Sequence, residues 1–388
     1  MRIHTPLREE AQCLARLRIL LYPKNLNVHA EINARDSAFP SVATDRYIAW
    51  VMPARAYQPA WWIPGAHLRT LWGKFMRPRM PLPTRTERWT TEDNDFLDLH
   101  RLDAPVGAPR LLILHGLEGT ARSHYAGGLL KEAQRRGWAA DLLIFRSCGD
   151  EPNRSLRFYH SGETSDLDAV VRRLIAEDPS RPLLLVGVSL GGNVLLKWLG
   201  EQGERAPGQL RGAAAVSVPF DLARGSRFLD RGFSRFYQAH FLRSLRRKAI
   251  GKSALYPRSI RPEVVRRART LYQFDDLVTA PVHGFRDADD YYTRSSSLHF
   301  LAHVRTQTLL LSARDDPFLP SAVLGEVREI ARENPSLHLE FVDRGGHVGF
   351  ISGTLPWRPF YYAEWRVAEF LANALATGNA ITATGKHA

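Results

Sequence analysis

A short stretch around Ser189 limits what this chain can fold into. Residues 183–188 form an apolar run, residues 193–199 carry apolar side chains at helical spacing, and Ser189 lies between them. A strand that turns sharply into a helix strains the backbone and leaves no room for nearby side chains, which fits Gly187 and Gly191. The pattern predicts a hydroxyl held at the end of a sheet, beside a helix N-terminus that favours an oxyanion. A plain tight turn is the alternative, because Gly-x-Ser-x-Gly alone is a weak pattern.

Composition places the chain among ordinary globular proteins. The 388 residues are 44% hydrophobic and 24% charged, which argues against disordered and fibrous classes. The net charge of +13 is spread along the chain, so we interpret it as a nonspecific surface property and expect no nucleic-acid partner. Cys13 and Cys148 are too few for a disulfide framework or a cysteine-based zinc site, and we expect no cofactor and no metal.

The amino-terminal residues do not have the pattern of a signal peptide. Glu9 and Glu10 precede any apolar run that could form its core, and no stretch of the chain reaches the roughly 18 apolar residues of a membrane span. We therefore expect a cytoplasmic protein.

From residue 85 onward, apolar runs alternate with segments of helical spacing. Crossover helices between the runs predict a mostly parallel sheet flanked by helices, after an opening antiparallel pair of strands. The predicted strands are 86–90, 96–102, 111–115, 139–145, 183–188, 212–218, 306–311 and 337–342, and the predicted helices are 123–136, 164–177, 320–333 and 359–376. The alternation fails between about residues 219 and 303, where we expect a helical cap insertion.

These segments divide the chain into three parts. Residues 51–376 form the predicted α/β domain, residues 1–50 are an extension of uncertain order, and residues 377–388 are a polar tail that we expect to fray. Within the domain, residues 52–83 are rich in Trp, Phe and Pro. Such a segment is typical of one that wraps over a core and buries its rings, with ligand contact as the alternative.

The predicted cap contains an aromatic stripe. Apolar side chains recur at helical spacing, and basic residues lie mostly on other faces. The apolar residues are Phe233, Phe236, Tyr237, Phe241 and Leu245, and the basic ones are Arg243, Arg246, Arg247 and Lys248. The stripe either packs the cap on the core, or lines an acyl pocket and meets a lipid interface with its cations toward anionic head groups.

Partners for Ser189 follow it in the chain. A serine needs a base to remove its proton and an acid to orient that base, and in an α/β-hydrolase they come in the order serine, acid, histidine. Asp315 and Asp316 follow one predicted strand, and His347 follows the next. Singly, an aspartate could cap a helix and the histidine could be an ordinary loop residue, but their joint order favours a triad. We favour Asp316 as the acid, because Pro317 fixes a turn that exposes it, and Asp315 is the alternate.

Acyl transfer also needs donors for the developing oxyanion. The backbone amide of Leu190 is one candidate, at the start of the helix after Ser189. The second is the amide of Leu117, in the loop after the strand at 111–115. His115 in that loop is interpreted as a structural residue rather than a base.

Four motifs in order resemble one known family. They are FRSCGDEPNR from residue 145, YHSGET from residue 159, GVSLGGN from residue 187 and DDPF from residue 315. These are similar to YheT-like α/β-hydrolases of the AB hydrolase 4 family, which includes acylglycerol lipases and medium-chain ester synthase/esterases. The resemblance implies an α/β-hydrolase fold, carboxylic ester hydrolysis, and roles for Ser189, Asp316 and His347 as nucleophile, acid and base. Ser147 and Asp150 depart from the family's loop motif, which we expect to alter the pocket rim.

The predicted function is hydrolysis of a small-molecule or lipid ester through an acyl-enzyme, with peripheral membrane contact through the basic cap. Acyl transfer to an alcohol is a close alternative, because water and alcohol would use the same residues. A less favoured alternative is a protein that has the hydrolase fold but only binds a ligand and does not catalyse a reaction. A His-x-x-x-x-Asp match from His338 to Asp343 lies along a predicted strand, so we interpret it as a coincidence. The sequence leaves the oligomeric state open.

Overall fold

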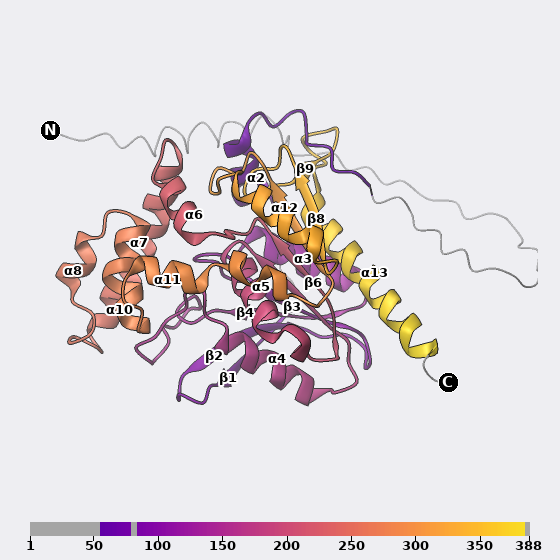
Figure 1. The fold of residues 1–388 in the computed structure, drawn as a ribbon, viewed down its shortest axis with the longest axis horizontal. Helices are drawn as coiled ribbons and strands as arrows, with labels where there is room; N and C mark the ends of the chain where they lie inside the picture. Colours follow the sequence, from indigo (N-terminus) through magenta and orange to yellow (C-terminus); the bar gives the residue numbers. More distant parts are fainter. Residues whose placement is uncertain (1–54, 79–83, 385–388) are drawn as a thin grey trace, which may run out of the picture.

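The computed structural model describes residues 55–78 and 84–384 (Figure 1). The extension predicted at residues 1–50 lies outside these ranges. The last helix, α13 (Tyr362–Thr384), continues past the predicted end at residue 376 and takes up the first part of the predicted tail. No proline follows Tyr362, so nothing in the backbone chemistry forces the helix to stop there.

The centre of the molecule is an eight-stranded sheet in the order β1-β2-β4-β3-β5-β6-β7-β8. The strands are β1 (Arg85–Thr90), β2 (Phe96–Leu102), β3 (Arg110–Leu114), β4 (Ala139–Ile144), β5 (Leu183–Val188), β6 (Leu210–Val216), β7 (Thr308–Ala313) and β8 (Leu337–Val342). β2 pairs antiparallel with β1 and β4, and the other pairs are parallel. The predicted fold class is confirmed. Only the bounds of β6 and β7 differ from the prediction by two residues, because pairing with neighbouring strands sets where a strand begins.

Helices cover both faces of the sheet (Figure 1). On one side α3 (His124–Arg135) packs against α13, and on the other α5 packs against α4 and the 3-10 helix η3. The bounds of these elements are α4 (Ser165–Glu177), α5 (Leu190–Gln202), η1 (Gly203–Arg205), η3 (Ser297–His303) and α12 (Val323–Glu333). β5 is buried at every position, as expected for a parallel strand between two helical layers. β5 is also an inner strand, between β3 and β6. Ser189, which follows its carboxyl end, therefore lies near the middle of the row of strand ends.

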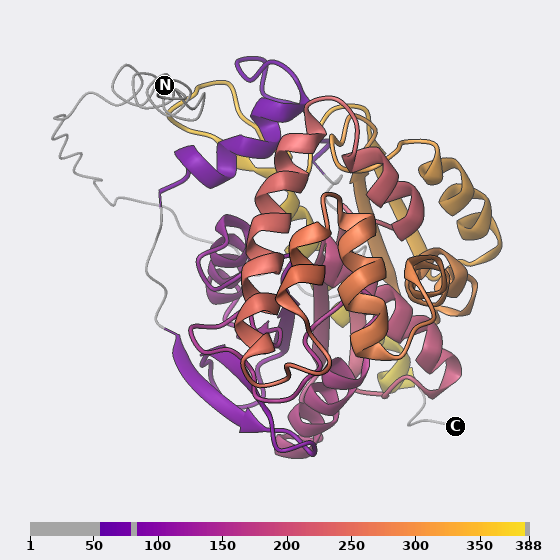
Figure 2. The same cartoon turned by 90° about the vertical axis from the view of Figure 1, so that its left-hand side faces the viewer.

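The cap is helical, as predicted, and lies over that edge (Figure 2). Its elements are α6 (Leu222–Leu229), α7 (Ser234–Ser253), α8 (Pro262–Arg267), α9 (Leu271–Phe274), the π-helix η2 (Asp275–Thr279), α10 (Ala280–His283) and α11 (Ala288–Ser295). Most of them share a hydrophobic cluster separate from the core of the sheet, with Leu242, Leu245 and Phe274 among its members, whereas α11 packs on Leu222 of α6 in a second cluster. The end of the predicted insertion, η3, belongs to the layer beside α5 instead.

The aromatic segment before β1 wraps over the far end of the chain. Ala60 and Ile63 pack on Ile351, and the Trp62 ring contacts the Trp72 ring edge-on at 4.8 Å. The segment includes α2 (Ala66–Met76), and Ile351 begins a two-stranded sheet of β9 (Ile351–Ser352) and β10 (Phe360–Tyr361). The prediction of buried rings is wrong for part of this segment, because Trp61 is exposed to solvent.

Candidate active site

Ser189 occupies the sharp turn between β5 and α5. Its φ of 54° and ψ of −121° lie in a region that residues with side chains rarely adopt. A Cβ on Gly187 would lie 2.4 Å from the carbonyl oxygen of Gly191, and one on Gly191 would lie 2.5 Å from that of His115. The crowding predicted around this turn is therefore confirmed, and both glycines are required by backbone contacts.

The three predicted catalytic side chains meet at this turn. The Nε2 atom of His347 lies 3.0 Å from Ser189 Oγ, and its Nδ1 atom lies 2.8 Å from Asp316 Oδ2. The Phe318 ring stacks on the imidazole, with centroids 4.1 Å apart, and the Phe318 amide donates to Asp316 Oδ1 at 2.8 Å. His347 and Asp316 are buried, so their mutual orientation is fixed by packing as well as by the hydrogen bond. This arrangement fits proton transfer from the serine hydroxyl.

Asp315 has a different position from its neighbour. Its Oδ1 atom accepts hydrogen bonds from the amides of Gly345 and Gly346 at 2.7 and 2.8 Å, and its Oδ2 atom pairs with Arg69 at 3.2 Å. The two adjacent carboxylates are thus divided between two tasks: Asp316 contacts the imidazole, whereas Asp315 holds the loop that carries it. The alternate assignment of Asp315 as the partner of His347 is not what the structure shows.

Leu117 and Leu190, the two residues predicted as backbone donors, line the same cavity as Ser189. Leu190 begins α5, where no preceding helical turn supplies an acceptor for its amide. In the loop after β3, the amides on either side of Leu117 are used: Gly116 donates to Tyr125 Oη and Glu118 donates to Tyr159 Oη, each at 2.8 Å. These bonds fix the loop around Leu117, whose own amide has no acceptor within the part of the chain that the structure describes.

His115 is a structural residue, as predicted. Its Nδ1–H donates to the Gly116 carbonyl at 2.8 Å, and its Nε2 atom accepts from the Phe145 amide at 3.1 Å. Complete burial lowers the pKa of His115 to about 4, so the ring stays neutral at physiological pH. Both ring nitrogens are occupied, which leaves none for catalysis.

Comparisons with known proteins agree with this geometry. Residues 109–354 match the family described as alpha/beta hydrolase fold. YheT of Escherichia coli (strain K12) is 38% identical over 314 residues, which cover 80% of this chain and 91% of that protein. The chain belongs to the α/β-hydrolase fold family. The YheT-like relationship indicated by the sequence motifs is confirmed.

Other similar proteins are named as a phospholipase and an esterase. Phospholipase ABHD3 of Mus musculus is 30% identical over 309 residues, covering 77% of this chain and 74% of that protein. Among solved structures, the Pyrococcus furiosus esterase Pf2001 covers 75% of this chain and 92% of its own, with a TM-score of 0.50 and 18% identity, which shows the shared fold. The protein is therefore a hydrolase of the esterase and lipase type.

Side chains from α2 and the sheet support the catalytic loop of this α/β-hydrolase. Thr70 Oγ accepts from the His347 amide at 2.9 Å, and Ser217 Oγ accepts from the Val348 amide at 3.0 Å. Neither Thr70 nor Arg69, the partner of Asp315, was predicted from the sequence. Thr70 is 277 positions from His347, and no local pattern links the two. The composition of residues 52–83 was the only signal that this segment was unusual.

The cap is tied directly to the loop of Leu117. Glu118 Oε1 accepts from Lys248 Nζ at 2.7 Å and from Tyr159 Oη at 2.8 Å, and Ser244 Oγ donates to Oε2. Ser244 and Lys248 lie one turn apart on α7. The basic residues were expected mostly on other faces of the helix than the aromatic stripe, and Lys248 is an exception, since it pairs with Glu118, which lines the cavity.

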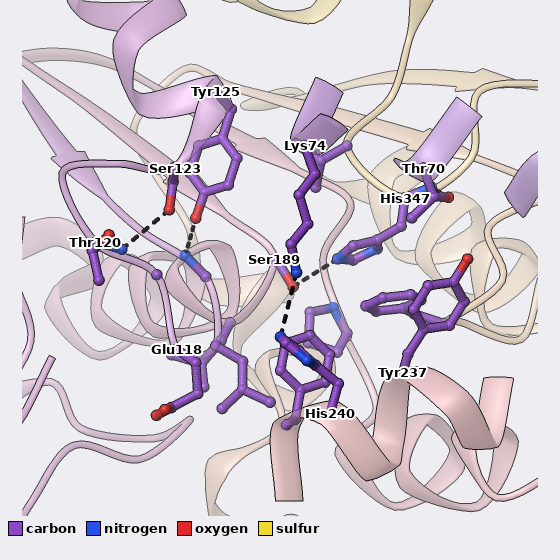
Figure 3. Close-up of a pocket in the computed structure, with 18 of the residues that line it drawn as sticks. Thr70, Lys74, Glu118, Thr120, Ser123, Tyr125, Ser189, Tyr237, His240 and His347 are labelled. Carbon is purple, nitrogen blue, oxygen red and sulfur yellow. Dashed lines mark hydrogen bonds between the residues drawn. The ribbon is translucent and has the colours of Figure 1, made fainter. Parts of the chain in front are cut away.

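Ser189 and His347 open into one large cavity of about 1170 Å³ (Figure 3). Lys74 of α2 and His240 of α7 meet across it in front of Ser189, with Nζ and Nε2 3.3 Å apart. The cap side of the cavity is mainly apolar, and its wall includes Leu222, Leu229, Leu245, Leu271 and Phe274. Four of the five residues of the predicted aromatic stripe line it, and only Phe233 does not. The interpretation of the stripe as a pocket wall is therefore the better one.

The two residues that depart from the family's loop motif lie away from the cavity wall. Neither Ser147 nor Asp150 is among the residues that line the cavity, so the expectation that they alter its rim is wrong. Ser147 Oγ instead donates to Asn153 within its own loop. Across residues 55–78 and 84–384, no three His, Cys, Asp or Glu side chains are grouped as ligands for a metal ion.

Proposed function

We propose that this α/β-hydrolase is a serine carboxylic ester hydrolase that works through an acyl-enzyme. The proposal rests on the hydrogen-bonded series from Ser189 Oγ to His347 Nε2 and from His347 Nδ1 to Asp316 Oδ2. His347 accepts the hydroxyl proton as Ser189 Oγ attacks the ester carbonyl carbon, and Asp316 stabilises the imidazolium that forms. The proton then passes from His347 to the oxygen of the leaving alcohol, and the carbon–oxygen bond to that alcohol breaks.

Water completes the cycle on the same residues. His347 removes a proton from a water molecule, whose oxygen attacks the acyl carbon, and the collapse of the second tetrahedral intermediate returns the proton to Ser189 Oγ. In both steps the negative charge on the carbonyl oxygen develops beside the amides of Leu117 and Leu190. Preorganised donors of this kind contribute about 3–4 kcal/mol each to transition-state stabilisation.

The substrate class that fits best is an acyl ester with a hydrocarbon chain, of medium-chain or monoacylglycerol type. The apolar cap wall can bury such a chain. The lipid substrate implied by the name of the mouse relative supports the same class. The cavity volume of about 1170 Å³ exceeds what a short acyl group would fill.

The decisive experiment compares the purified protein with three variants. We expect the wild type to hydrolyse p-nitrophenyl esters and to be labelled by a fluorophosphonate, and Ser189→Ala to lose both. Asp316→Asn should retain labelling at a greatly reduced rate, with kcat lower by about 10⁴. Ser226→Ala, a serine in the cap wall of the same cavity, is the matched control and should behave as the wild type. An inert wild type that no fluorophosphonate labels would overturn the proposal in favour of a binding protein.

A further inference from the structure

Three segments of the chain carry almost all of its net charge. Residues 55–78, 231–253 and 351–361 together contain twelve Lys and Arg residues and no Asp or Glu. The remainder of the chain is nearly neutral, because the net charge of the whole is +13. The net charge, which the sequence analysis took to be spread along the chain, is therefore concentrated in these segments. We call these three segments the collar.

The collar segments are far apart in sequence but adjacent in the fold. α2 lies beside the first half of α7 (Figure 2), where His67 Nδ1 and Tyr237 Oη are 3.1 Å apart. The third segment contacts the residues just before α2, since Trp61 Nε1 donates to the Thr354 carbonyl at 3.2 Å. Lys74 and other residues of α2 and α7 line the cavity. Each of the three collar segments therefore contributes residues to the wall of the cavity that contains Ser189.

Large apolar side chains are exposed on the collar. Of the ten large hydrophobic residues exposed in the described parts of the chain, seven belong to it. They are Trp61, Leu68, Phe75, Phe233, Phe236, Leu355 and Trp357. Trp61 is 78% exposed and Trp357 is 53% exposed, which is costly in water for the largest apolar side chains. Exposed apolar groups at this density mark an interaction surface.

Basic residues are interspersed with these rings. Arg231, Arg235, Arg243, Arg247 and Arg358 are exposed, and no carboxylate pairs with them in the described part of the chain. Basic residues that do find partners point inward, as Arg69 does toward Asp315 and Lys248 toward Glu118. The outward-facing charge is therefore uncompensated and available to an anionic partner.

We propose that the collar docks on an anionic lipid surface. Trp and Phe insert at the boundary between head groups and acyl chains, and Arg side chains bind the anionic head groups. A nucleic acid would use the charge but leave Trp61, Trp357 and Phe233 exposed. The surface lies on α2, the start of α7 and residues 351–361, rather than on the basic face of the cap alone as the sequence suggested. Residues 55–78 and 84–384 include no helix long and apolar enough to cross a bilayer.

Co-sedimentation with vesicles tests this inference on the full chain. We expect binding to vesicles that contain phosphatidylglycerol, little binding to vesicles of phosphatidylcholine alone, and loss of binding as the salt concentration rises. Two double variants, Trp61→Ser with Trp357→Ser and Arg231→Glu with Arg235→Glu, should each weaken binding at least about tenfold. The matched control is Leu255→Ser with Arg258→Glu, two exposed residues of the cap outside the collar, and it should bind as the wild type does.

Further measurements separate docking from catalysis and from misfolding. All variants should unfold at the wild-type temperature and hydrolyse a short, water-soluble p-nitrophenyl ester at the wild-type rate, since none of these residues lines the cavity. Ser189→Ala should still bind vesicles, so the inference stands or fails independently of the proposed ester hydrolysis. Equal binding to both kinds of vesicle, undiminished binding by the collar variants, or binding to nucleic acid or to a second copy in place of lipid would overturn it.

Discussion

Ser189 is held in a backbone conformation that is costly by itself. A residue with a side chain at a φ of 54° and a ψ of −121° costs about 1–3 kcal/mol, which the surrounding structure must offset. Here the offset comes from hydrogen bonds around the turn, including one from the Ser189 amide to the Val216 carbonyl at 2.8 Å. The conformation projects the hydroxyl out of the turn, toward His347.

Gly191→Ala tests how tightly that turn is packed. The added Cβ would lie 2.5 and 2.6 Å from the carbonyl oxygens of His115 and Leu114, and these are backbone atoms that cannot rotate away. We expect a loss of about 3 kcal/mol in the free energy of unfolding, measured by urea denaturation, and loss of esterase activity. Gly251→Ala on α7 meets nothing within 4 Å and should stabilise the protein by about 0.5–1 kcal/mol. Equal stabilities of the two variants would contradict this account.

Asp275 predicts a pH dependence of stability. Burial raises the pKa of this carboxyl, on the cap wall of the cavity, from 3.8 to about 6, despite hydrogen bonds from Tyr292 and Thr279. Between the ordinary pKa of 3.8 and the raised pKa of about 6, the folded protein binds more protons than the unfolded chain. The free energy of unfolding therefore falls as the pH rises through this range.

The Asp275→Asn variant isolates this contribution. Between about pH 4 and pH 7, its stability relative to the wild type should rise by about 2–3 kcal/mol, since the amide has no charge to bury. Chemical denaturation at both pH values measures the change. A difference between the two proteins that stays constant with pH would show that the Asp275 carboxylate is not destabilised by burial.

At the scale of elements, three parts of the chain share the positioning of His347. The loop between β7 and α12 supplies Asp315 and Asp316, α2 supplies Arg69 and Thr70, and the histidine follows β8. The glycine amides at residues 345–346 bind Asp315, so the loop that carries the histidine is held from the same turn that holds the acid. The loop that carries His347 is therefore positioned by contacts with other parts of the chain rather than by the conformational preference of its own residues.

Asp315→Ala should separate this support from direct catalysis. Loss of two backbone hydrogen bonds and the contact with Arg69 should lower kcat about tenfold and the free energy of unfolding by about 2 kcal/mol. Asp316→Ala should lower kcat by about 10³–10⁴, because the imidazole loses its partner. Steady-state hydrolysis of a p-nitrophenyl ester compares them. Equal losses of kcat would mean that both carboxylates act on His347 directly.

Lys248→Met tests the tie between the cap and the oxyanion loop. Glu118 follows Leu117 directly, so releasing it from α7 should loosen the Leu117 amide and lower kcat about tenfold while KM changes little. Arg247→Met, an exposed neighbour on the same helix, serves as the control and should leave kcat unchanged. If Lys248→Met raised KM without lowering kcat, the Lys248–Glu118 ion pair would contribute to substrate binding rather than to stabilisation of the transition state.

At the scale of the whole molecule, the cap and the sheet form one active site between them. The sheet edge supplies the reactive groups, and the cap supplies most of the apolar wall. We expect kcat/KM for p-nitrophenyl esters to rise about fourfold for each added methylene until the apolar wall is filled, because burial of one methylene contributes about 0.8 kcal/mol. A series of esters from acetate to dodecanoate measures it. A flat or falling profile would show that the acyl chain does not enter the cap.

Local chemistry explains what could be read from the chain alone. The glycines around Ser189, the order of Asp316 and His347, and the alternation of strands with helices depend on sterics and periodicity within short windows, so the fold class and three catalytic candidates followed from them. Even the ends of β6 and β7 were predicted to within two residues.

Packing between distant segments decided the rest. The contacts of Asp315 with the glycine amides, the support from Thr70 and the pairing of Lys248 with Glu118 each depend on which side chains meet after folding. The collar has the same origin: three segments without acidic residues lie far apart along the sequence and form a charged, apolar surface only where α2, α7 and residues 351–361 converge. Contacts of this kind are long-range, and no local pattern encodes them.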